Sequence, residues 1–189
     1  AAGVRPEIEL GPIRPPQRLA PFSYALGAEV KRDEASILAE CPGTETESAG
    51  DAFGRLILLH DPEGAEAWDG TMRLVAFIQA DLDSYEAVDP LLPEVAWSWL
   101  VEALESRSDE VTALGGTVTA TTSVRYGDIS GPPRAHQLEL RASWTATTLA
   151  LGTHVQAFCE VLEHAAGETV AASVPCLLRH RLEGQEALV

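Results

Sequence analysis

Alternation of apolar and polar residues predicts two pairs of β-strands. The stretch RLILLHD, residues 55–61, is a continuous apolar run of strand length and is typical of a strand buried on both faces. A second strand is predicted over 72–82, where every other residue is apolar. Residues 117–126 and 137–144 alternate more regularly still, and the turn-rich segment between them predicts an antiparallel hairpin with one buried and one solvent-facing side.

Helical spacing of apolar residues marks three other segments. Phe22, Ala25, Leu26 and Val30 predict a helix that ends near residue 33. A second helix is predicted to begin at Asp89-Pro90, to continue through residues 95–114 and to stop at Gly115-Gly116. A third apolar stripe over 155–166, stopped by a glycine, predicts the last helix.

The predicted order is therefore α-β-β-α-β-β-α. Because the strands come in hairpin pairs, we expect a two-layer α+β fold, with a mainly antiparallel sheet of about four to five strands packed by helices. We expect residues 22–167 to form a single domain, preceded by a proline-rich extended arm over 1–21. Segment 33–51, with six carboxylates and no Lys or Arg, is expected to be a mobile acidic loop, and 168–189 a C-terminal tail.

The distribution of charge argues against nucleic-acid binding. The chain carries a formal net charge of -16. Residues 1–32 hold five basic and three acidic side chains, a net of +2, which leaves -18 on the rest. Such a body repels phosphates, so nucleic-acid binding would depend on the basic N-terminal arm alone.

Composition also limits the compartment and the cofactors. No window holds the roughly 18 to 20 apolar residues that a membrane span needs, and residues 1–11 lack the pattern of a secretory signal. Three widely spaced cysteines and five histidines form neither a disulfide framework nor a zinc motif. We therefore expect a cytoplasmic protein with no metal, no cofactor and no membrane attachment.

Several segments together resemble one protein family. They are RPEIEL (5–10), PPQRLAP (15–21), GRLILLHDPEG (54–64), AWDGTMRLVAF (67–77), DPLLPEVAWSWLVEAL (89–104), GGTVT (115–119) and LELRASWT (138–145). They are similar to an actinobacterial family catalogued as a domain of unknown function, number three thousand. The resemblance implies an actinobacterial cytoplasmic protein and carries no reaction, cofactor or catalytic residue. The predicted element order separately resembles the fold of small secretion chaperones, which are dimeric binding proteins.

His60 and Asp61 are the best catalytic candidates, because a histidine next to a carboxylate at a strand end can act as an acid or base. Neighbouring strand residues point to opposite faces, however, so the two side chains need not meet. We favour a structural role, in which Asp61 starts the Asp-Pro turn and His60 caps the strand edge.

Tryptophans are the best candidates for a binding surface. Trp97 and Trp99 are about 200° apart on a helix, so they cannot share a face. Trp99 falls on the main apolar stripe and is expected in the core. Trp97 and Val101 form a second track, which lies either under the N-terminal arm or against a partner, and Trp68 in a predicted turn is similarly open.

The sequence thus favours a non-catalytic protein-binding or adaptor module that self-associates. The alternative is an enzyme of unrecognised class with a cleft at the strand ends, lined by His60, Asp61 and either Arg125 or Arg141.

Overall fold

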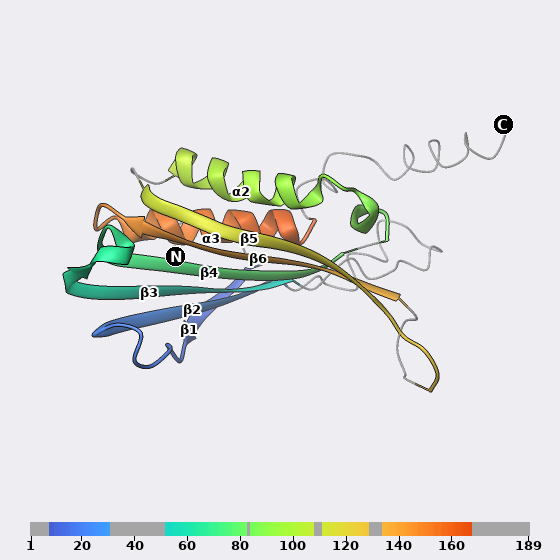
Figure 1. The fold of residues 1–189 in the computed structure, drawn as a ribbon, viewed down its shortest axis with the longest axis horizontal. Coiled ribbons are helices and arrows are strands. Elements are labelled where there is room, and N and C mark those ends of the chain that lie inside the picture. Colours follow the sequence, from blue (N-terminus) through green and yellow to red (C-terminus); the bar gives the residue numbers. More distant parts are fainter. Residues whose placement is uncertain (1–7, 31–51, 83, 108–110, 129–133, 168–189) are drawn as a thin grey trace.

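The computed structural model describes residues 8–30, 52–82, 84–107, 111–128 and 134–167. Six strands form one antiparallel sheet in the order β1-β2-β3-β4-β6-β5, and two α-helices pack on one of its faces (Figure 1). The strands are β1 (Ile8–Ile13), β2 (Phe22–Val30), β3 (Ala52–Ala65), β4 (Gly70–Leu82), β5 (Val111–Val124) and β6 (Arg134–Ala146). The helices are α2 (Leu92–Arg107) and α3 (Leu151–Ala165), with short 3-10 helices η1 (Glu66–Trp68) and η2 (Glu86–Val88).

The α+β class and the antiparallel sheet are confirmed, but the predicted strand number and element order are wrong. The described order is β-β-β-β-α-β-β-α, with six strands instead of four to five. The main error concerns residues 22–30, which form strand β2 between β1 and β3 instead of a helix. Phe22, Leu26 and Val30 fit a helical period, but they also fit the alternation of a strand, and the neighbouring strands decide between the two.

The central helix is shorter than its apolar spacing predicted. Helix α2 ends at Arg107, and residues 111–124, which include Gly115-Gly116, belong to strand β5. The polar residues that follow the buried Leu104 end the apolar stripe, so the later match of Val111 and Leu114 to a helical period is accidental. The expected acidic loop at 33–51 and the tail at 168–189 lie outside the described residues.

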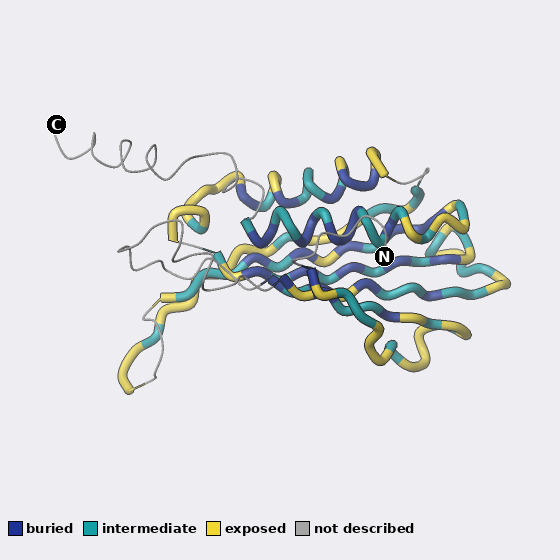
Figure 2. The backbone as a smooth tube through the Cα atoms, turned by 180° about the vertical axis from the view of Figure 1, so that it is seen from behind, coloured by how far each residue is buried: buried dark blue, intermediate teal, exposed yellow. Residues whose placement is uncertain are grey.

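The core lies between the sheet and the two helices. Alternate residues of β4 are buried beneath the helices, namely Met72, Leu74, Ala76, Ile78 and Ala80, and so are alternate residues of β6, namely Leu138, Leu140, Ala142, Trp144 and Ala146. Figure 2 shows this alternation along the backbone, with buried positions concentrated under the helices. Helix α3 approaches the sheet at Gly54, where a Cβ atom would stand 2.6 Å from Cζ of Phe158. Glycine at this position therefore sets the distance between the two layers.

One polar pair lies inside this core. Trp144 and His154 are 0% and 1% exposed, and the indole Nε1–H of Trp144 donates to Nδ1 of His154 at 3.2 Å. A buried donor without an acceptor is costly, so this bond fixes how α3 docks on β6.

No helix in the described part of the chain is long and apolar enough to cross a lipid bilayer.

Candidate functional site

The two outer strands of the sheet differ sharply in the features that prevent a further strand from pairing with them. Strand β1 has six residues and includes Pro12, which has no amide hydrogen to donate. Strand β5 has 14 residues, VTALGGTVTATTSV, with no charge and no proline, and most of them are exposed. Proteins normally protect an outer strand with charges, prolines or bulges. The only such device in β5 is a bulge between Thr112 and Gly115, after which its pairing with β6 is regular to Val124. In the described part of the chain, the outward backbone groups of 115–124 have no partner strand.

The flank of helix α2 that faces β5 carries the tryptophan singled out by the sequence. The Cζ3 atom of Trp97 stands 2.8 Å from the position that a Cβ on Gly116 would occupy, so the ring packs directly on the backbone of β5. Trp97 and Val101 are both partly buried and are one helical turn apart. Their expected cover was the N-terminal arm or a partner, whereas the contact that the structure shows is with Gly116. We call Trp97 and Val101 the α2 flank.

Trp99 lies on the other side of the same helix. Its ring centroid is 5.6 Å from that of His164 on α3, and it is partly buried against the core. The two tryptophans therefore contact different elements and do not form one aromatic site.

His60 and Asp61 are both engaged in local structure. A hydrogen bond of 3.1 Å joins Nδ1 of His60 to the carbonyl oxygen of Thr71, and the His60 ring lies 5.9 Å from the ring of Phe22. The Asp61 carboxylate accepts the amide hydrogen of Glu63 at 3.1 Å, as an Asx turn requires. In the described residues, His60 has no ion pair with a carboxylate. The structure thus does not bring these two residues together as an acid–base pair.

Arg141 and Arg125, the other residues of the enzyme hypothesis, also lie away from His60. Arg141 stacks 5.5 Å from the ring centroid of Phe77 and pairs with Glu139 at 2.8 Å. Arg125 follows β5 at the far end of the β5–β6 hairpin. In the register of the sheet, His60 pairs with Met72, whereas Arg141 pairs with Phe77, five residues further along β4.

A cavity of 540 Å³ does lie on the face of the sheet opposite the helices, which we call the open face. It is formed by β1, β2 and the start of β3, next to Phe53. Its lining includes three glycines, Gly11, Gly27 and Gly54, two arginines, Arg14 and Arg55, and two glutamates, Glu9 and Glu29. Because its charges are mixed and His60 is not part of the lining, the cavity does not revive the enzyme hypothesis.

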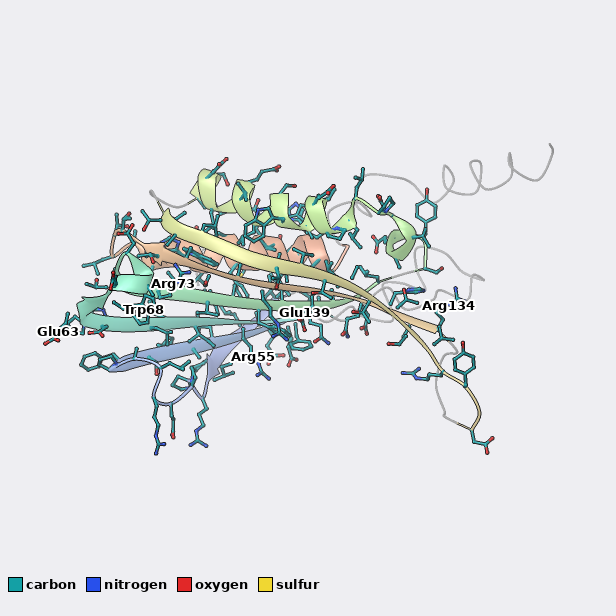
Figure 3. The ribbon with its side chains drawn as sticks, viewed as in Figure 1. Arg55, Glu63, Trp68, Arg73, Arg134 and Glu139 are labelled. Carbon is teal, nitrogen blue, oxygen red and sulfur yellow. The ribbon has the colours of Figure 1, made fainter. Side chains whose placement is uncertain are left out.

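A cluster around Arg73 is the feature that the sequence did not reveal. From β4, Nη1 of Arg73 donates to the carbonyl oxygen of Ala113 at 2.8 Å and to Oγ1 of Thr145 at 3.1 Å, and Nη2 donates to Oγ of Ser143 at 2.7 Å. The Thr145 hydroxyl in turn donates to the carbonyl oxygen of Trp68. Trp68 is partly buried in η1, and Figure 3 shows it and Arg73 at the same end of the sheet. No local spacing could have predicted a cluster assembled from β4, β5, β6 and η1.

The described residues contain no group of three His, Cys, Asp or Glu side chains that could hold a metal ion. Cys159 lies in the core, where burial raises the pKa of its thiol to about 11, with Glu163 adding to the effect. A thiol with so high a pKa is a poor nucleophile at neutral pH.

Comparison with known proteins gives one match. A family model described as "Protein of unknown function (DUF3000)" matches residues 1–173, a range that includes every strand and helix described above. A search of curated proteins and a search of solved structures each found no match. The family resemblance noted in the sequence is thus confirmed and extends beyond the segments that suggested it. The chain belongs to the DUF3000 family of proteins of unknown function.

Proposed function

We propose that this protein is a non-catalytic protein-binding module, and that it pairs with a second copy of itself by strand addition at β5. One observation carries the proposal: β5 is a long outer strand without charge or proline, whereas β1, at the other side of the sheet, is short and contains Pro12. An unprotected outer strand presents a row of backbone donors and acceptors to any strand that can align with it.

The α2 flank supports the same surface. Because Trp97 packs on Gly116 of β5, this side of the helix lies above the outer strand (Figure 1). A strand added beside β5 would run along the partly buried side chains of Trp97 and Val101. Backbone hydrogen bonds would then supply the pairing, and the flank would supply apolar area to bury.

A second copy is favoured as the partner because β5 itself is neutral. The chain as a whole carries -16, and two such chains repel each other, but β5 places no acidic side chain in the joint between them. Salt screens the long-range repulsion and leaves the backbone pairing intact. We therefore expect dimerisation to strengthen as ionic strength rises, which is opposite to the behaviour of an interface held by opposite charges.

Sedimentation velocity over a concentration series, at low and high salt, tests the proposal. The key variant is Thr119→Lys, in the exposed regular part of β5, and its matched control is Gln17→Lys, which adds the same charge at an exposed loop position. Thr119→Lys should weaken dimerisation roughly fivefold, because like charges brought together across paired strands cost on the order of 1 kcal/mol. Gln17→Lys should dimerise as the wild type does. A wild type that stays monomeric at its highest soluble concentration would overturn the proposal, and so would equal effects of the two lysines.

A further inference from the structure

Arg73 differs from the ion-paired arginines of this structure in the kind of partner it has. Arg107 and Arg141 each pair with a carboxylate, Glu160 and Glu139 respectively. Arg73 bonds to a backbone carbonyl and two hydroxyls, all of them neutral, and in the described part of the chain it makes no ion pair. In a protein of net charge -16, a cation held without a counter-ion is an unusual arrangement.

The bonds that Arg73 makes leave part of its guanidinium group unused. A guanidinium has five N–H groups, and three of them are taken by Ala113, Ser143 and Thr145. The Nε–H group and one N–H of Nη2 remain. A guanidinium binds an oxyanion with two parallel hydrogen bonds when two such N–H groups point the same way.

The residues that bond to the guanidinium are closely packed and conformationally restricted. Thr145 is 1% exposed, and its methyl group stands 2.7 Å from where a Cβ on Gly70 would lie, so glycine is needed there. Ala113 has a left-handed backbone, with φ of 51°, in the bulge of β5, and its carbonyl oxygen accepts from Arg73. Holding a residue with a Cβ in this conformation costs free energy, and the surrounding bonds must supply it.

A second, independent observation also indicates a ligand. Thr112 lies opposite Thr145 in the register of β5 and β6, on the same face of the sheet. Its Oγ1 atom is buried and has no hydrogen-bond partner among the described residues. A buried hydroxyl is normally satisfied, so this group is a donor available to a bound acceptor. Partial burial also lowers the pKa of Arg73, because the cation is less well solvated there than in water.

We infer that Arg73, together with the hydroxyl groups of Thr112 and Ser143, forms a binding site for a carboxylate attached to an apolar group. The two free N–H groups of Arg73 would bind the two carboxylate oxygens. The apolar group would lie along the open face, where Val75, which is partly exposed, is the next residue of β4 on the same side as Arg73. This site lies at the bulge of β5, before residues 115–124, which form the regular part of the strand proposed to pair with a second copy.

A carboxylate fits the surroundings better than a phosphate. The end of β3 and its connection to β4 carry Glu63, Glu66 and Asp69 at this end of the sheet. A phosphate that carries nearly two negative charges meets about twice the repulsion that a carboxylate meets, while an arginine offers the same two bonds to either.

Titration calorimetry and amide NMR with three probes test this inference. Hexanoate supplies the carboxylate and the apolar chain, hexanol supplies the chain alone, and inorganic phosphate supplies a different oxyanion. For a ligand of this size we expect a Kd for hexanoate on the order of 1 mM. We expect no saturable binding of hexanol and at least tenfold weaker binding of phosphate.

Two variants locate the site. Arg73→Gln should weaken hexanoate binding at least tenfold, whereas Arg141→Gln, which removes an arginine already paired with Glu139, should leave it unchanged. Because Arg73→Gln also removes the bond to Ala113 in the bulge of β5, the wild type gives a second measurement that needs no variant. Hexanoate should shift the side-chain Nε–H signal of Arg73 and the amide signals of Thr112 and Ser143.

The other outcomes would overturn the inference. These are a wild type that does not bind hexanoate, a Kd unchanged by Arg73→Gln, equal binding of hexanol, and tighter binding of phosphate. Thr119→Lys should retain the hexanoate site even though it weakens dimerisation, so failure of one proposal can be distinguished from failure of the other.

Discussion

Replacing Gly116 by alanine tests the packing between helix α2 and the outer strand. A Cβ at this position would lie 2.8 Å from Cζ3 of Trp97 and 2.9 Å from Cα of Ala142, and well inside contact distance of the carbonyl oxygen of Arg141. Two of these three atoms belong to the backbone of β6 and cannot rotate away. Ordinary contact begins near 3.4 Å, so β5 would have to move away from β6 by at least half an ångström.

The size of the effect follows from this geometry. Inserting one carbon into a filled site costs about 1–3 kcal/mol, and we expect the upper half of that range because backbone must move. For a chain of this length, 2–3 kcal/mol corresponds to a fall in Tm of roughly 5–10 °C. Gly115→Ala is the matched control, because nothing lies within 4 Å of the Cβ it would add. It should change the free energy of unfolding by less than about 0.5 kcal/mol, or raise it by restricting the unfolded chain.

Urea unfolding, followed by far-UV circular dichroism and tryptophan fluorescence, measures both variants. The midpoint urea concentration should fall for Gly116→Ala with little change in the slope m, since the surface exposed on unfolding stays the same. Combining Gly116→Ala with Trp97→Ala should relieve only part of the clash, because the contacts with β6 remain. If Gly116→Ala and Gly115→Ala unfold at the same urea concentration, the close packing of Trp97 on β5 is wrong.

Three further predictions concern the core. Gly54→Ala should destabilise the fold by about 1–3 kcal/mol in urea unfolding, because the new Cβ meets the Phe158 ring at 2.6 Å, and Phe158→Leu in the same chain should restore part of the loss. Trp144→Phe leaves Nδ1 of His154 without its donor and should cost about 1–3 kcal/mol by the same measurement; a loss below 0.5 kcal/mol would contradict the buried hydrogen bond. Burial raises the pKa of Cys159 from 9.0 to about 11, so the unfolded chain loses this proton near pH 9 and the native chain only near pH 11. The free energy of unfolding should therefore fall between these pH values by at most about 1.4 kcal/mol per pH unit, and Cys159→Ala should remove this fall. In a chain lacking the other two cysteines, the Cys159 thiol should not react with Ellman's reagent at pH 8.

Regular alternation was enough to predict some of the strands. Strands β4 and β6 follow the predicted ranges closely, because one side of each faces the helices and the other faces away, whereas β5 begins at Val111, six residues before the predicted strand. Strand β2 could not be predicted this way, since Phe22, Leu26 and Val30 suit a helix as well as a strand. Pairing with β3 makes residues 22–30 a strand, and β3 lies in a distant part of the sequence.

The candidate sites likewise combine features that the sequence predicts with features that only the tertiary structure shows. The separation of Trp97 from Trp99 follows from helix geometry alone, but the fact that Gly116 covers Trp97 depends on tertiary packing. The neutral, proline-free run of β5 is visible in the sequence, but its outer position in the sheet is not. Arg73 reaches partners 40, 70 and 72 residues away, and no local pattern encodes contacts at such distances.

The strand order β1-β2-β3-β4-β6-β5 has a consequence for synthesis on the ribosome. Strands β2, β3 and β4 can each pair with a neighbour that has already emerged, so this part of the sheet can form while the rest of the chain is still being made. Strand β5 emerges before β6, which among the described strands is the only one it pairs with and which joins it to β4. The neutral strand must therefore wait, without a partner, until β6 is complete. Nascent chains are most exposed to aggregation during that interval, and a chaperone that shields residues 111–124 would act at this step.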